Sequence, residues 1–245
     1  MSKVAPHNAW IEYANGNSGP YVVKWFREGG KFTAGQEARA YDVLRRLLDD
    51  VPGARAASIL ALDEAANTLS LEFIEGLSLH ERLAQGEFDI LEETRERLLR
   101  IFIGARDNGF FFDSDPSNIL FEAGATDGQN LVFIDPSCIT LPIRDHAFIV
   151  FMWGLIKILL RDWRVWHIWK MRPYWDSLWR GYCALSNVSG ASLAQQMVAY
   201  IDLVIRWNKE RNPVEGPITY SFRRLVVIPI YRAVRLWFLW NSMSR

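Results

Sequence analysis

Asp113, Asn118 and Asp135 have the residue types and the spacing that phosphoryl transfer requires. Asn118 follows Asp113 by five residues, and Asp135 follows Asn118 by seventeen, at the end of the apolar run Leu131 to Ile134. One carboxylate can orient the attacking hydroxyl, while an amide and a second carboxylate hold a metal ion against the phosphates of a nucleotide. Mg²⁺ takes few ligands from protein, so one Asn and one Asp suffice. The pattern predicts a catalytic Asp113 and a Mg²⁺ site at Asn118 and Asp135.

A β-hairpin is the element expected to bring the two metal ligands together. Residues 118–121 and 131–134 are apolar β-type runs, and the polar, turn-rich stretch 122–130 separates them. Two such runs joined by a turn favour an antiparallel hairpin. Asn118 and Asp135 would then lie side by side at its open end.

A lone lysine in an apolar strand is the next candidate upstream. Lys24 lies within the β-type run Tyr21 to Phe26, and a buried Lys without a partner is costly. A helix is expected to follow, with Thr33 as its N-cap and Gln36 completing a capping box. Glu37 would then lie in the first turns of this helix, where it can face Lys24.

In this order, these residues resemble the catalytic core of the protein-kinase-like superfamily, whose loop H-R-D-x-x-x-x-N precedes a D-F-G metal site. Asp113 falls on the loop Asp, Asn118 on its Asn and Asp135 on the metal Asp. Lys24 falls on the Lys of the V-A-I-K strand. In the family that Lys clamps the α- and β-phosphates and pairs with a helix Glu, here Glu37.

The chain departs from the family pattern at three places. Phe111 stands where the loop His is expected, and Pro136-Ser137 stands where Phe-Gly is expected. Asp115 occupies the position that holds Lys in protein kinases. It could be a third catalytic or metal carboxylate, or a residue of the loop surface.

The stretch Glu72-Phe73-Ile74-Glu75-Gly76 looks like the linker of aminoglycoside-phosphotransferase-like kinases. The resemblance implies that the backbone at Glu72, Phe73 and Ile74 binds the adenine of ATP. It covers roughly residues 10–150. It implies an α+β, two-lobed protein-kinase-like fold, with a reduced β-rich N-lobe over residues 1–75 and a helical C-lobe over 76–245.

The charge of the chain is divided unevenly, although the net charge is zero. Residues 1–150 hold 14 Lys+Arg against 23 Asp+Glu, whereas residues 151–245 hold 14 against 5 and nine of the eleven Trp. A Trp-rich helical core with a solvated basic face would explain this composition. Peripheral contact with an anionic membrane would also explain it, because Trp prefers the interface and basic residues are drawn to anionic lipid. No nucleic-acid motif accompanies the basic residues, so nucleic acid is not an expected partner.

The acceptor is expected to be a small molecule. Few residues separate Asp135 from Asp145, whereas protein kinases dock peptides on a longer activation segment that ends in A-P-E. Among kinase-like families, the chain looks most similar to the aminoglycoside phosphotransferases and the lipopolysaccharide core sugar kinases, and the latter act on a membrane-anchored sugar. The expected activity is therefore ATP- and Mg²⁺-dependent phosphoryl transfer to a hydroxyl of a small-molecule or lipid-linked sugar acceptor.

A catalytically inactive module is the rival hypothesis. Kinases cover the phosphates with a glycine-rich hairpin before the Lys strand, but only nine residues precede Trp10. Either this lid is reduced, or another element takes its place, or the chain has lost strong nucleotide binding. The chain could then be a pseudokinase that binds a partner or a membrane surface.

The cytoplasm is the expected location, with contact at the inner face of the membrane. Cys138 and Cys183 are too few for a disulfide scaffold, which favours a reducing compartment, and the first residues do not resemble a signal peptide. The longest apolar run, Ala147 to Ile156, stops at Lys157 and is too short to span a bilayer.

Overall fold

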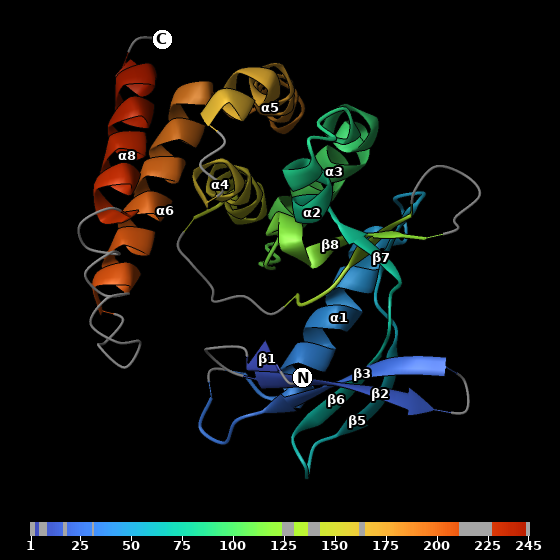
Figure 1. The fold of residues 1–245 in the computed structure, drawn as a ribbon. Coiled ribbons are helices and arrows are strands. Elements are labelled where there is room, and N and C mark those ends of the chain that lie inside the picture. The colour runs from blue at the N-terminus through green and yellow to red at the C-terminus, as the bar shows by residue number, and fades with distance from the viewer. Residues whose placement is uncertain are drawn as a thin grey trace.

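The chain folds as an α+β protein of two lobes, as expected from the sequence. In Figure 1 a β-rich N-terminal lobe lies below a helical C-terminal lobe, and helix α1 leans from the first lobe toward the second. The structure is a computed structural model. It describes residues 3–4, 9–16, 19–30, 32–123, 130–136, 143–161, 165–210 and 227–243.

The N-terminal lobe is built on an antiparallel five-stranded sheet of order β1-β2-β3-β6-β5. Its strands, in chain order, are β1 (Lys3–Val4), β2 (Ala9–Gly16), β3 (Gly19–Phe26), β5 (Ile59–Asp63) and β6 (Thr68–Glu72). The sequence left little room for a strand before Trp10, yet β1 pairs with β2 through Val4 and Trp10. Residues 5–8, which join these two strands, lie outside the described residues.

A second, four-stranded sheet of order β4-β9-β8-β7 lies between the first sheet and the helices. Its strands are β4 (Ala54–Ala56), β7 (Gly76–Ser78), β8 (Ile119–Glu122) and β9 (Leu131–Phe133). The predicted hairpin is confirmed as β8 and β9, which pair antiparallel. Strand β4 was not predicted from the sequence, because three residues are too few to show an alternation of apolar and polar side chains. Its parallel pairing with β9 ties the chain that leaves α1 to the strand that leads into Asp135.

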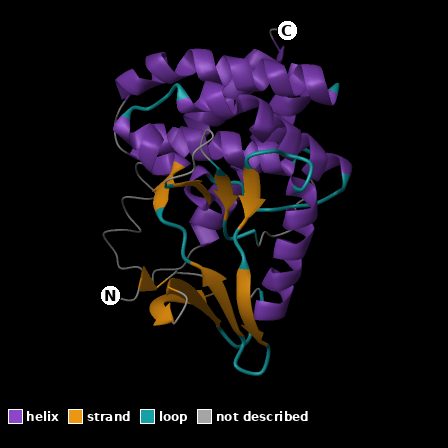
Figure 2. Ribbon diagram, turned by 90° about the vertical axis from the view of Figure 1, so that its right-hand side faces the viewer, coloured by secondary structure: helices purple, strands orange, loops and turns teal. Residues whose placement is uncertain are grey.

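Seven α-helices are described, together with the 3₁₀ turn η1 (Pro116–Asn118). They are α1 (Ala34–Leu48), α2 (Leu79–Gln85), α3 (Ile90–Asp107), α4 (His146–Arg161), α5 (Val165–Ser186), α6 (Gly190–Glu210) and α8 (Ile228–Met243). The predicted capping box of α1 is present, with the Thr33 hydroxyl and the Gln36 amide each accepting from the other's backbone N–H. Figure 2 shows the other helices gathered beyond the second sheet.

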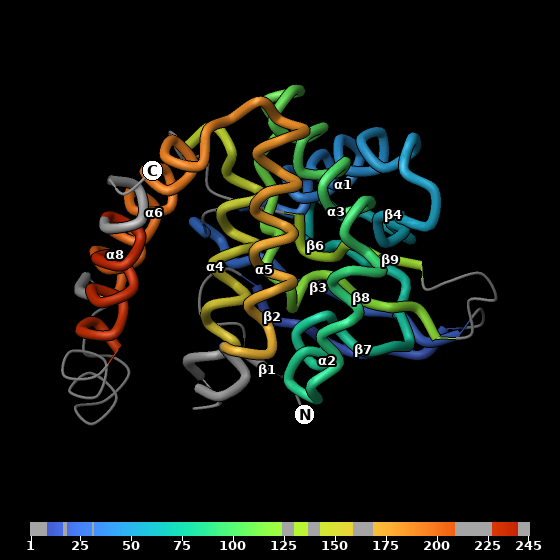
Figure 3. The backbone as a smooth tube through the Cα atoms, turned by 90° about the horizontal axis from the view of Figure 1, so that it is seen from above, coloured from blue at the N-terminus to red at the C-terminus, as the bar shows by residue number. Residues whose placement is uncertain are grey.

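Helix α4 is the centre of the C-terminal lobe, with Phe148, Phe151 and Met152 fully buried. Helices α6 and α8 lie side by side at one edge, on the left of Figures 1 and 3. Among the described helices, none is by itself long and apolar enough to cross a membrane. Only α5 and α6 together reach that length and composition, and the chain bends by 113° between them. The lobe boundary expected at residue 75 stays a prediction.

Candidate active site

Lys24 lies on the middle strand of the first sheet and contacts two carboxylates. Its Nζ donates to Glu37 Oε1 on α1, as expected, and lies 3.0 Å from Asp135 Oδ1. Lys24 and Glu37 are both buried. Burial lowers the pKa of Lys24, but the negative charges of Asp135 and Glu37 outweigh burial and raise it overall. Lys24 is therefore a permanent cation that joins both lobes.

Asp135 follows β9 in a backbone conformation that is uncommon for a residue with a side chain, at φ +52°. Its backbone N–H donates to the hydroxyl of the fully buried Tyr41 at 3.0 Å, and Tyr41 lies on α1 one turn after Glu37. The Asp135 side chain is 48% exposed. One of its oxygens faces Lys24, and the group remains accessible to a ligand. Tyr41 was not predicted from the sequence, although a Tyr on the apolar face of the predicted helix was a signal, because a buried hydroxyl needs a partner.

Asp113 and Asn118 lie on the loop between α3 and β8. The Asn118 side-chain amide donates to the backbone O of Asp113 at 3.3 Å, which leaves its Oδ1 free to act as an acceptor. The backbone O of Asn118 accepts from Ile134 N–H at 2.9 Å. Asn118 is therefore adjacent to the residue before Asp135, as the predicted hairpin requires.

Burial, with the nearby charges of Asp115 and Asp135, raises the pKa of Asp113 to about 6. The backbone N–H of Asp115, which donates to Asp113 Oδ1 at 3.1 Å, opposes this shift, as does the charge of Lys157. A carboxylate with a pKa near neutrality can accept a proton from a hydroxyl more readily than an ordinary Asp. Asp113 is therefore suited to the role that the sequence predicted.

Asp115 is engaged in an ion pair and is not placed as a third metal ligand. Its Oδ2 pairs with Nζ of Lys157 on α4, and its Oδ1 accepts from the Ser117 backbone N–H at 3.1 Å at the start of η1. Burial raises the pKa of Asp115, but Lys157 and Ser117 outweigh burial and lower it overall. Within the described part of the chain, no group of three or more His, Cys, Asp or Glu side chains is placed to hold a metal ion.

The expected Mg²⁺ site would therefore use two protein ligands, Asn118 and Asp135. This donor set fits Mg²⁺, which prefers oxygen and retains most of its water. The Asn118 amide oxygen and the half-exposed Asp135 carboxylate both supply oxygen. The metal roles of both residues stay predictions.

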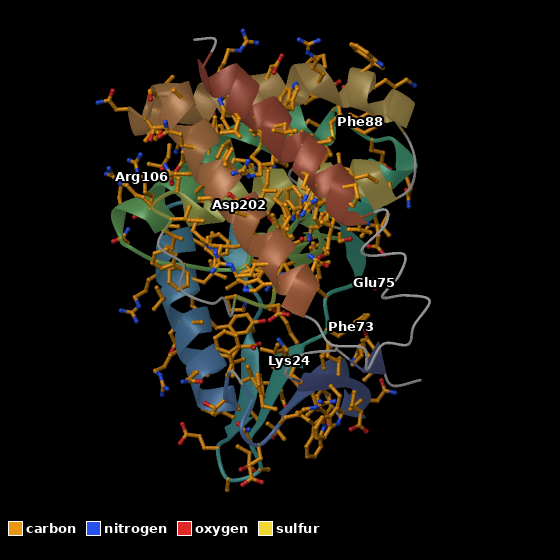
Figure 4. All side chains as sticks on the ribbon, turned by 90° about the vertical axis from the view of Figure 1, so that its left-hand side faces the viewer. Lys24, Phe73, Glu75, Phe88, Arg106 and Asp202 are labelled. Carbon is orange, nitrogen blue, oxygen red and sulfur yellow. The ribbon has the colours of Figure 1, made fainter. Side chains whose placement is uncertain are left out.

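The segment expected to bind adenine leaves the first sheet at the end of β6. The Glu72 side chain accepts from the Ser58 backbone N–H at 2.6 Å and pairs with Arg55, so it is not directed at a ligand. The exposed Phe73 ring meets Tyr13 edge-on at 6.0 Å. Figure 4 shows Phe73 and Glu75 on the connection that rises toward the helical lobe, with Lys24 just below. Ile74 packs against the core. Adenine binding by the backbone of Glu72, Phe73 and Ile74 stays a prediction.

Asp145 is buried immediately before α4 and braces the start of that helix. Its carboxylate accepts from the Tyr182 hydroxyl and the Gln196 amide, both at 2.6 Å. The buried Ser114, next to Asp113, donates to the backbone O of Ala147. The catalytic loop therefore lies against a fixed helix.

No model of a known protein family matches the chain, and no curated protein matches its sequence. Among 61 matching chains of solved structures is Rad53 1-466 in complex with AMP-PNP, at 18% identity and TM-score 0.40, with 65% of this chain and 46% of that chain covered. Another is the kinase domain of maize SIRK1 bound to AMP-PNP, at 14% identity and TM-score 0.32, with 66% and 56% covered. The chain spans about half the length of both.

The described residues include a strand lysine paired with a helix glutamate, a loop between a helix and a hairpin, and a carboxylate after the hairpin, in the order that the kinase-like resemblance predicted. The similarity to Rad53 and SIRK1 is too distant to carry an argument about activity.

Proposed function

We propose that this protein is an ATP- and Mg²⁺-dependent phosphotransferase that acts on a hydroxyl group. One observation carries the proposal: a single buried lysine, Lys24, binds both Glu37 of α1 and Asp135, which lies two residues after β9. Lys24 and Asp135 lie 111 positions apart in the sequence, and their contact is not an ion pair of the protein surface, because Lys24 is buried. A buried ion pair is weak evidence for stability, so a functional reason for it is favoured.

The chain's residues would divide the work as follows. Lys24 clamps the α- and β-phosphates, and Glu37 holds its ammonium in place. Asp113 orients the acceptor hydroxyl and accepts its proton, for which its raised pKa is suited. Asn118 and Asp135 would hold Mg²⁺, which would neutralise charge on the phosphates. Catalysis of this kind depends on positioning and on preorganised charge.

A small molecule is the acceptor that we propose. Nine residues, 136–144, separate Asp135 from Asp145, and α4 begins at His146. A segment this short offers little backbone for docking a peptide. Residues 137–142 lie outside the described residues, so this support comes from the length of the sequence alone.

The test is transfer of the labelled γ-phosphate of ATP, with Mg²⁺, to a panel of sugars, amino sugars, a lipid-linked sugar and a generic peptide. We expect label on a sugar-type acceptor, at a rate that Asp113→Asn reduces by about 10²-fold or more. Asp176→Asn on α5, where the side chain is half exposed, is the matched control and should transfer at the wild-type rate. Label on the peptide alone would overturn the proposed acceptor class.

We also propose that the acceptor is presented at a membrane. Trp169 on α5 and Trp237 on α8 are 72% and 54% exposed, and Leu236 is exposed beside Trp237. Exposed Trp near basic residues favours an anionic lipid surface. Sedimentation with anionic vesicles should show binding at low salt that weakens at high salt. No binding at low salt would remove the membrane from the proposal and leave the transferase intact.

The inactive module remains the second candidate. Residues 5–8, between β1 and β2, are Ala-Pro-His-Asn and include no glycine for a phosphate-covering turn. An inactive module would transfer no label to any acceptor and would hydrolyse no ATP above the level of Asp113→Asn.

A further inference from the structure

Helix α4 touches the catalytic loop along one face. Ala147 accepts from Ser114, Gly154 lies against Pro116, and Lys157 pairs with Asp115. Positions 147, 154 and 157 share one side of the helix, since residues three and seven apart are neighbours on a helix surface. The loop that carries Asp113 is therefore docked on α4 at successive turns.

The glycine in this face is what allows Lys157 to reach the loop. A Cβ at position 154 would overlap Pro116 Cδ and would lie 3.4 Å from Asp115 Oδ2. Glycine inside a helix costs about 1 kcal/mol relative to alanine. Helix α4 has this unfavourable glycine at the position where the helix lies against Pro116. Lys157 lies one turn further on, where its ammonium meets Asp115.

Lys157 retains donors that Asp115 does not use. An ammonium group has three N–H donors, and the side chain of Lys157 is 42% exposed. Lys24, by contrast, is 8% exposed and already has two carboxylate partners. Asp115 is also bound to the catalytic residue, because its backbone N–H donates to Asp113 Oδ1. The accessible ammonium of Lys157 is therefore held by Asp115, the residue whose backbone N–H binds Asp113.

We propose that Lys157 is a substrate-binding residue of this site, and that its ammonium, held in place by Asp115, contacts the γ-phosphate of ATP. The inference rests on the proposed phosphotransferase function. The charges around Asp113 support it: Lys24 pairs with Asp135 and Lys157 pairs with Asp115, and both of these carboxylates act electrostatically on Asp113. A phosphate group that approaches Asp113 therefore meets negative charge, and Lys157 supplies a cation from the helical lobe.

The test compares binding of Mg²⁺ with AMP-PNP, a non-hydrolysable ATP analogue, and of Mg²⁺ with ADP, by calorimetric titration of the whole chain. Lys157→Met should weaken AMP-PNP binding by about 10-fold and leave ADP binding within about twofold, because ADP lacks the γ-phosphate. Lys157→Arg should retain AMP-PNP binding. Asp115→Asn should weaken it less than Lys157→Met does, since the ammonium is kept but loses the carboxylate that holds it in place.

The double variant Lys157→Met/Asp115→Asn distinguishes contact between Lys157 and the γ-phosphate from simple neutralisation of the Asp115 charge. If Lys157 only offsets the negative charge of Asp115, removal of both restores AMP-PNP affinity, and the inference is overturned. If Lys157 touches the phosphate, the loss persists in the double variant. Equal weakening of AMP-PNP and ADP, or unchanged affinities, would also overturn the inference and leave the proposed function standing. No nucleotide binding by the wild type would overturn both.

Discussion

Lys24 in the N-terminal lobe and Lys157 in the C-terminal lobe both pair with an aspartate next to the catalytic loop, but their surroundings differ. Lys24 is enclosed between Glu37 and Asp135, whereas Lys157 pairs with Asp115 and has a side chain that is 42% exposed. Burial of a charge requires that its donors be satisfied by protein. An exposed lysine can keep donors for a ligand. The first lysine therefore holds the site together, and the second is available to bind.

The largest effect is expected at Lys24. In Lys24→Met the buried Glu37 loses the ammonium that it binds, and removal of one member of a buried ion pair typically costs about 3–5 kcal/mol. Urea unfolding should show this loss. The double variant Lys24→Met/Glu37→Gln should recover much of the stability, because the buried carboxylate is removed together with its lysine. A Lys24→Met protein as stable as the wild type would show that this pair is not the buried link we describe.

A pH effect of opposite sign is expected at His146 and Asp113. Burial lowers the pKa of His146 from 6.5 to about 4, so stability should fall as the pH drops through this range. Burial and neighbouring charges raise the pKa of Asp113 from 3.8 to about 6, so stability should rise as the pH drops through that range. Each contribution amounts to at most about 3 kcal/mol, and the two act in opposite directions in the wild type.

Two variants separate these terms. Asp113→Asn should lose stability between pH 6.5 and 4, since the contribution of His146 is no longer opposed by that of Asp113. His146→Gln should gain stability over the same range, with the Asp113 term alone. Chemical unfolding at several pH values measures both. Parallel pH profiles for the two variants would contradict the burial of these groups.

An intermediate effect is expected at Gly154. Alanine inside a helix is ordinarily about 1 kcal/mol more favourable than glycine. Because a Cβ at 154 would overlap Pro116, Gly154→Ala should instead destabilise by about 1–3 kcal/mol and slow phosphate transfer. Gly190→Ala is the matched control, since its Cβ would lie an ordinary 3.6 Å from Trp179 Nε1. Gly154→Ala with raised stability would refute close docking of the loop on α4.

The smallest effect on stability is expected at Lys157. Its ion pair is partly exposed, so Lys157→Met should cost about 1 kcal/mol or less by urea unfolding. The loss of unfolding free energy should therefore be much smaller in Lys157→Met than in Lys24→Met. A loss at Lys157 as large as that at Lys24 would mean that both lysines are structural.

The parts of the fold that carry a local signal could be predicted from the sequence. The capping box of α1, the strand with Lys24 and the hairpin of β8 and β9 each follow from residue types at short spacing. Because the capped helix follows the Lys24 strand, Glu37 in its first turns was expected to face Lys24. The resemblance to kinases extended this to Asp113, Asn118 and Asp135.

The contacts that were missed depend on the tertiary structure. Strand β4 is three residues long and exists through its pairing with β9. Lys157 looked like the end of an apolar run, although a lone lysine on a buried helix carries the same signal that identified Lys24. Its partner Asp115 was recognised as unusual, but no short-range pattern could join residues 42 positions apart.

The most direct test of the central claim is thermal unfolding with and without saturating Mg²⁺ and ATP, in the wild type and in Asp135→Asn. The two-lobed site at Lys24 and Asp135 predicts a wild-type Tm that rises by several degrees, since about 2.7 kcal/mol is gained at a hundredfold excess over Kd. The rise should need Mg²⁺ and should be largely lost in Asp135→Asn. An unchanged wild-type Tm, or an equal rise in both proteins, would contradict the account.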